Sequence, residues 1–145
     1  MVKYTALEGF PLNNEEINNL NYEAFFPRFG SVFKKIHSIE WNSGIQISPN
    51  FFLSKVDTLF EDFIYPQSLF NLVLYDPFAP GCQPEMWSEQ MLEKMFYTMA
   101  PGGLLVTYCA QGAFRRALKS CGFTIEKLPG PPGKREMTRA VKTDS

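Results

Sequence analysis

The residues LFNLVLY at positions 69–75 form a short, mostly apolar run that ends at Asp76. Such a run is typical of a central strand that is buried on both faces of a sheet. A second run, LLVTYC at residues 104–109, follows one helix later. Ser88 is a suitable cap for that helix, and the Pro-Gly-Gly of residues 101–103 ends it. A strand, a helix and a second strand in this order predict an α/β sheet.

The segments on either side continue the alternation. Further strands are predicted at residues 2–8, at 45–56 with a turn at residues 49–50, and at 123–128 and 135–142. Further helices are predicted to begin at Asn13, whose side chain is a suitable cap, at Pro27 and at Gly112. The last of these is expected to end at Gly122 in a left-handed conformation. In such a sheet, ligands bind beyond the carboxyl ends of the strands. Three polar features fall there, namely Glu8, Asp76 and the turn at residues 108–112.

Phe29, Phe33 and Ile36 recur at helical spacing, so we expect this aromatic stripe to lie in the core. His37 has apolar neighbours and is the only histidine. We expect it to sit in or beside the core, without a catalytic role. The three cysteines show no metal-ligand spacing, so no metal site is predicted.

Length and composition narrow the class of protein. The chain has 145 residues, 45% of them hydrophobic and 20% charged, which fits a single domain over residues 1–145 and excludes disorder. No apolar run approaches the roughly 18–20 residues of a membrane span, and the N-terminus lacks the features of a signal peptide. We therefore expect a cytoplasmic protein with no membrane partner.

The charge is unevenly distributed. Residues 1–110 carry 6 Lys/Arg and 12 Asp/Glu, whereas residues 111–145 carry 8 Lys/Arg and 3 Asp/Glu. A basic final quarter on an acidic body indicates either a site for a polyanion or a solvated surface of mixed charge.

The motif DPFAPGCQPEMW at residues 76–87 resembles the signature of the MnmC-like tRNA methyltransferases. The Pro-Gly-Gly of residues 101–103, Thr107-Tyr108 with Gly112, and GKREM at residues 133–137 match that family in the same order. The resemblance implies a Rossmann-like class I methyltransferase sheet, with helices on both faces, mostly parallel strands and an antiparallel last strand. It also implies S-adenosylmethionine as the methyl donor, without FAD, and a tRNA substrate modified at 5-aminomethyl-2-thiouridine in the wobble position.

The resemblance also assigns roles to individual residues. Glu8 would accept hydrogen bonds from the cofactor ribose, Asp57 would approach the adenine, and Asp76 would be the catalytic carboxylate beside the acceptor amine. The residues that would bind the tRNA substrate are Phe78, Trp87, Tyr108, Arg115, Arg116, Lys119, Lys134 and Arg135. Phe78 and Trp87 would wall the pocket or stack on the base, and the cations would bind phosphates, although one of the two adjacent arginines could be structural.

The sequence departs from the family at its cofactor loop. The chain has no Gly-x-Gly and begins at what resembles the family's second strand, so an N-terminally truncated domain with weak cofactor binding is expected. A preceding segment or a second copy of the chain would complete the sheet. The alternative function is a non-catalytic module that binds RNA or protein through the basic final quarter.

Overall fold

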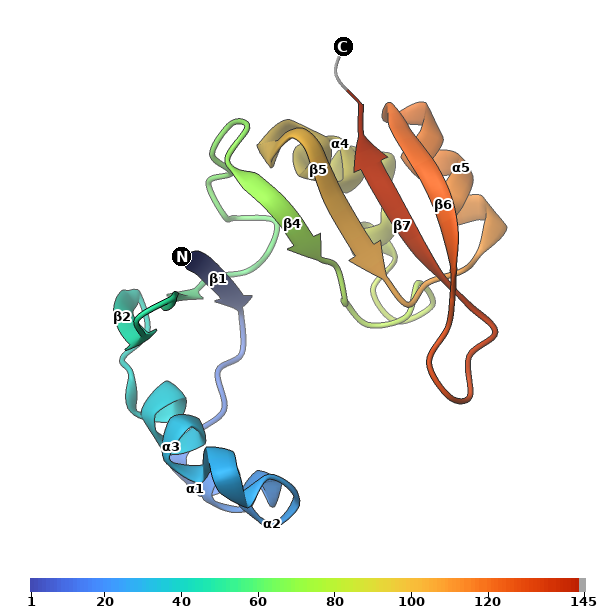
Figure 1. Ribbon diagram of the computed structural model, residues 1–145. Helices are drawn as coiled ribbons and strands as arrows, with labels where there is room; N and C mark the ends of the chain where they lie inside the picture. Colours follow the sequence, from blue (N-terminus) through green and yellow to red (C-terminus); the bar gives the residue numbers. More distant parts are fainter. Residues whose placement is uncertain (144–145) are drawn as a thin grey trace. The chain divides into compact units, whose positions relative to one another are not determined.

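The computed structural model describes residues 1–143. These residues form two compact units, one of Met1–Phe63 and a second that begins at Ile64. Each unit has its own sheet (Figure 1). We call them unit 1 and unit 2 and describe each by itself. The prediction of one domain over residues 1–145 stays a prediction.

Unit 1 has a three-stranded sheet in the order β1-β3-β2. Its strands are β1 (Val2–Glu8), β2 (Ser43–Ser48) and β3 (Phe51–Asp57). Its helices are α1 (Asn14–Asn18), α2 (Tyr22–Phe25), the 3-10 helix η1 (Pro27–Phe29) and α3 (Gly30–Ser38). β1 and β3 are parallel, whereas β2 and β3 form an antiparallel hairpin around the predicted turn at residues 49–50. The predicted cap at Asn13 is confirmed, because its side chain accepts a hydrogen bond from the Glu16 amide and the Glu16 side chain accepts one from the Asn13 amide.

Unit 2 has a four-stranded sheet in the order β4-β5-β7-β6. Its strands are β4 (Phe70–Leu74), β5 (Met99–Thr107), β6 (Phe123–Pro129) and β7 (Glu136–Lys142). Its helices are the 3-10 helix η2 (Pro84–Trp87), α4 (Glu89–Thr98) and α5 (Gly112–Ser120). β4 and β5 are parallel, and β7 is antiparallel to both β5 and β6. β4, β5 and β6 therefore share one direction, and the predicted antiparallel last strand is confirmed (Figure 1).

The core of unit 2 lies between its sheet and the helices α4 and α5 (Figure 1). The side chains that are no more than 1% exposed include Leu92, Met95, Met99, Leu105 and Leu118. Two glycines shape this unit. Gly122 follows α5 with a φ of 97°, which is the predicted left-handed helix end. A Cβ at Gly103 would lie 2.7 Å from the Ala100 carbonyl oxygen, so no larger residue fits there without a backbone shift.

Two predictions about burial are wrong. β4 is not buried on both faces, because it has one neighbouring strand and Leu72 and Leu74 remain 52% and 57% exposed. The aromatic stripe is not a core, because Phe29 is 54% exposed and neither Phe33 nor Ile36 is fully buried. Pro27 begins the 3-10 helix η1 rather than an α-helix.

β1 and β4 each pair with one strand. That a preceding segment or a second copy pairs with such an edge stays a prediction.

Candidate functional site

The loop after β4 carries Asp76 and is fixed by side chains from further along the chain. The Phe78 amide donates to Gln83 Oε1 at 3.1 Å, and the Phe78 carbonyl accepts from Trp87 Nε1 at 2.8 Å. Both backbone polar groups of Phe78 are thus bonded, while its side chain is 75% exposed. Asp76 is also exposed. The structure therefore presents an aromatic ring two residues from the predicted catalytic carboxylate, on a backbone that is held in place.

Trp87 contacts two other aromatic rings. Its ring meets Tyr75 edge-on at a centroid distance of 5.6 Å and Phe114 at 4.9 Å. Tyr75 is 1% exposed, and its hydroxyl donates to the Met86 carbonyl. Burial raises the pKa of Tyr75, so its hydroxyl stays protonated as a donor. Trp87 thus links the loop to the core of unit 2.

A second group of predicted residues lines a pocket with a volume of about 370 Å³. Its walls are two segments, the turn after β5 and the loop before β7, and its lining residues are Tyr108, Ala110, Lys134, Arg135 and Glu136. Lys134 Nζ lies 5.0 Å from the centroid of the Tyr108 ring, within the range of a cation–π contact. We call this cavity the 108/134 pocket.

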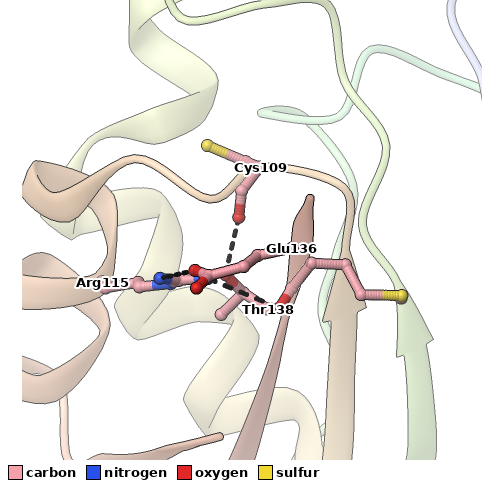
Figure 2. A network of polar contacts seen from close by, with 5 residues as sticks. Cys109, Arg115, Glu136 and Thr138 are labelled. Carbon is pink, nitrogen blue, oxygen red and sulfur yellow. Dashed lines mark hydrogen bonds and ion pairs between the residues drawn. The ribbon is translucent and has the colours of Figure 1, made fainter. Parts of the chain in front are cut away.

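Arg115 contacts the lining residue Glu136 and is part of a network of hydrogen bonds (Figure 2). Its Nε donates to Thr138 Oγ1 at 2.9 Å, and the Thr138 hydroxyl donates to the Cys109 carbonyl at 2.6 Å. A terminal nitrogen forms an ion pair of 2.9 Å with Glu136, and the other donates to the Met137 carbonyl at 3.4 Å. The Arg115 side chain is only 11% exposed. The hydrogen bond from Arg115 lowers the pKa of Glu136, and the nearby charges of Lys127, Arg115 and Arg135 act in the same direction.

The two adjacent arginines have different surroundings. Arg115 is engaged within unit 2, whereas Arg116 is exposed. Lys119 is exposed as well. Sequence reasoning allowed one of the two arginines to be structural but did not say which, because the partners of Arg115 come from a strand more than 20 residues later.

The two carboxylates predicted to bind the cofactor lie together in unit 1. Glu8 and Asp57 end the parallel strands β1 and β3 and are direct partners in their register. Glu8 Oε1 accepts from the Phe10 amide at 2.9 Å, and the Asp57 amide donates to Asn42 Oδ1 at 3.0 Å. A carboxylate at such a strand end suits the paired hydroxyls of a ribose. The carboxylates at these strand ends therefore fit the ribose end of S-adenosylmethionine as hydrogen-bond acceptors.

Sequence reasoning missed three residues that build these sites. Gln83, Glu136 and Thr138 fix the two loops, yet none stands out by spacing or residue type. Their roles depend on contacts across the fold. The nearest signal was that Gln83 and Glu136 lie inside the quoted motifs.

Residues 1–143 lack two further features. No group of three or more His, Cys, Asp or Glu side chains is arranged to hold a metal ion. None of the helices in this part of the chain has the length and apolar character required to cross a membrane.

The fold is an α/β fold of the type found in methyltransferases. The described structure is similar to that of MNMC2 from Aquifex aeolicus, with a TM-score of 0.67 and 18% identity over 95% of this chain and 43% of that one. The antibiotic-resistance methyltransferase Kmr is also similar, with a TM-score of 0.52 and 13% identity over 78% of this chain and 71% of that one. At these identities the likeness concerns the fold alone.

The sequence identifies the family. Residues 21–143 match the family of S-adenosyl-L-methionine-dependent methyltransferases, and the chain belongs to this family. The tRNA 5-methylaminomethyl-2-thiouridine biosynthesis bifunctional protein MnmC of Leptospira interrogans is 28% identical over 98% of this chain and 23% of its own length. The protein of the same name from Pseudoalteromonas translucida is 27% identical over 92% of this chain and 21% of its own length. These findings confirm the resemblance to MnmC-like methyltransferases and do not favour a non-catalytic module.

The match to MnmC proteins is partial in length. The chain spans 11–23% of the curated relatives that it matches. The activity and substrates of those whole proteins are therefore considered only as proposals for this chain.

Proposed function

We propose that this chain provides the acceptor side of an S-adenosylmethionine-dependent methyltransferase that acts on the aminomethyl group of a wobble uridine in tRNA. The observation that carries the proposal is the loop of Asp76, which follows β4 and is tied to Trp87 and Gln83 through Phe78. The similarity to proteins named for tRNA 5-methylaminomethyl-2-thiouridine biosynthesis supports the choice of substrate. We also propose a cytoplasmic location, in keeping with a tRNA substrate.

Asp76 would act on the acceptor amine. An aminomethyl group is protonated at neutral pH and cannot attack an electrophile until it loses a proton. A carboxylate beside it offsets the charge of the ammonium, orients the nitrogen and accepts or relays the proton. The exposed Phe78 ring would stack on the target base, so that the nitrogen is held at the carboxylate. Trp87 supports this arrangement by bonding to the Phe78 carbonyl.

Glu8 and Asp57 would hold the cofactor at its nucleoside end. Glu8 suits the ribose hydroxyls, and Asp57, its partner in the β1–β3 register, suits the neighbouring adenine. When bound, S-adenosylmethionine supplies a methyl group on a sulfonium, which is a good leaving group. Because residues 1–145 contain no Gly-x-Gly for the methionine end, we expect the isolated chain to bind the cofactor more weakly than micromolar. Calorimetric titration measures this affinity, and a micromolar value would contradict the expectation.

The experiment that tests the proposed function is the substitution Asp76→Ala. Methyl transfer is measured with labelled S-adenosylmethionine and tRNA that carries 5-aminomethyl-2-thiouridine, using the protein in its natural length. We expect a loss of about 100-fold or more, since general acid–base groups typically contribute 10²–10⁴-fold. Binding of the tRNA should be unchanged.

A matched control is Asp62→Ala, which removes another exposed carboxylate, in unit 1. It should leave the rate unchanged. Undiminished methyl transfer by Asp76→Ala would remove this residue from the mechanism.

A further inference from the structure

The 108/134 pocket has the chemistry of a site for one nucleotide of single-stranded RNA. Its lining combines an aromatic ring, that of Tyr108, with the cations Lys134 and Arg135. The ring is 46% exposed, so it has surface available for a base. Proteins bind single strands with this combination, in which bases stack on aromatic rings and cations follow the phosphates.

The one acid in the lining does not oppose such a ligand. Glu136 forms an ion pair with Arg115, which is not a lining residue, so its negative charge is balanced. The cations Lys134 and Arg135 have no such partner among the ion pairs of the described residues. The lining therefore presents an excess of positive charge toward an incoming phosphate.

The Arg115 network joins the two walls of the pocket. Through Thr138 it reaches the Cys109 carbonyl, which lies between the lining residues Tyr108 and Ala110. Through its ion pair it holds Glu136, which follows the two cations in the sequence. Figure 2 shows Arg115 reaching Glu136 and Thr138, and Thr138 reaching Cys109. The guanidinium thus contacts Thr138, Glu136 and Met137, and the Arg115 side chain is largely buried.

We propose that the 108/134 pocket binds one nucleotide of the substrate RNA, with its base on Tyr108 and its phosphate on Lys134 and Arg135, and that Arg115 positions the pocket without touching RNA. The proposal deepens the proposed function and rests on it for the identity of the RNA. It differs from the expectation that Arg115 itself binds phosphate.

The test measures binding of a fluorescein-labelled heptamer of uridine by fluorescence anisotropy between 50 and 200 mM salt, with the full chain and no cofactor. Tyr108→Ala should raise the Kd by about 5-fold or more, the range of one base stacked on one ring. Lys134→Ala should raise the Kd and reduce the slope of log Kd against log salt by about 0.7, the value for one phosphate contact on a single strand. Lys3→Ala is the control, because this exposed lysine lies on β1 of unit 1, outside the pocket lining, and should change both values less.

The positioning role of Arg115 is tested at Thr138. Thr138→Val keeps the shape and the charge but removes the hydroxyl between Arg115 and Cys109. We expect a Kd several-fold higher with an unchanged salt slope. If this variant does not fold, as judged by circular dichroism, Arg115→Lys serves instead: it keeps the charge but not the forked geometry, and it should give the same result.

Several outcomes would overturn the inference. A Kd that is insensitive to Tyr108→Ala and Lys134→Ala would contradict the nucleotide site, and binding of an acidic peptide but not of RNA would assign the pocket to a protein partner. A wild-type Kd for Arg115→Lys would contradict the positioning role. Because these measurements need no methyl transfer, failure of the Asp76 experiment with intact heptamer binding would reject the proposed function and leave the pocket in place.

Discussion

The two units bury different kinds of side chain. In unit 2 the most buried residues are mainly apolar, and Leu92, Leu105 and Leu118 are fully covered. Among residues 1–63, only Leu53 and Lys55 are buried. The difference shows that unit 2 gains stability from its own apolar core, whereas unit 1 leaves most of its apolar side chains partly exposed.

A lysine performs the same task in each unit, in different surroundings. Lys55 Nζ donates to the carbonyls of Ile36 and Ile39 at 3.3 and 2.9 Å and lies 4.3 Å from the centroid of the Trp41 ring. Lys142 Nζ donates to the carbonyls of Phe96 and Met99, both at 2.8 Å, and lies 4.7 Å from the Phe96 ring. Both ammonium groups satisfy carbonyls at the end of a helix. Lys55 is 6% exposed, whereas Lys142 is only partly buried.

The largest expected effect is the loss of stability when a side chain is removed from the apolar core of unit 2. Leu92→Ala should lower the free energy of unfolding by about 2–5 kcal/mol, because Leu92 is 0% exposed and its loss leaves a cavity. Phe29→Ala in unit 1 removes a larger side chain that is 54% exposed, and it should cost less than about 1 kcal/mol. Urea unfolding followed by tryptophan fluorescence measures both, since Trp41 reports on unit 1 and Trp87 on unit 2. Equal costs would contradict the difference between the units.

Replacement of Lys55 and of Lys142 by methionine should destabilise the protein by different amounts. Methionine keeps the length of lysine but donates no hydrogen bond, so each substitution leaves two carbonyls without this partner. Lys55→Met should destabilise by about 1–3 kcal/mol, the cost of an unsatisfied buried group, and Lys142→Met by less, because water can reach its carbonyls more easily. Thermal unfolding at pH 7 measures the difference.

Lys3→Met, at an exposed position of β1, is the control for the lysine pair. A higher Tm for Lys55→Met would show that the cost of burying its charge exceeds the gain from its hydrogen bonds.

The sequence predicted most elements of the fold, because their signals are local. The cap at Asn13, the hairpin turn at residues 49–50 and the helix end at Gly122 each depend on residues within a few positions. Burial was harder to predict. The apolar run of β4 looks buried in sequence, but exposure depends on how many strands and helices lie beside it.

The candidate sites show the same limit. The motif at residues 76–87 located the loop of Asp76, but the bond from Trp87 to the Phe78 carbonyl could not be read from spacing. Arg115 illustrates this most clearly. In sequence it is one of two adjacent cations, and its role as the centre of a network depends on residues 109, 136 and 138. Long-range contacts of this kind decide which cation is available to a ligand.

The smallest expected effect is a difference between the two units in the pH at which each begins to lose stability. Burial lowers the pKa of His37 from its ordinary value of 6.5, and the charge of Lys55 acts in the same direction. The unfolded chain then binds a proton more readily than folded unit 1, so unit 1 should lose stability as the pH falls below about 6.5. In unit 2 the lowered pKa of Glu136 stabilises the fold above its ordinary value of 4.5, and this contribution is lost only as the pH falls further through the folded pKa.

Urea midpoints measured between pH 3 and 8 should therefore decline first in the Trp41 signal and later in the Trp87 signal. His37→Gln should flatten the first decline, because the residue that titrates is gone. Glu136→Gln should flatten the second, and Glu85→Gln, an exposed acid outside the Arg115 network, should not. If both signals declined together near pH 6.5, His37 would not account for the acid sensitivity.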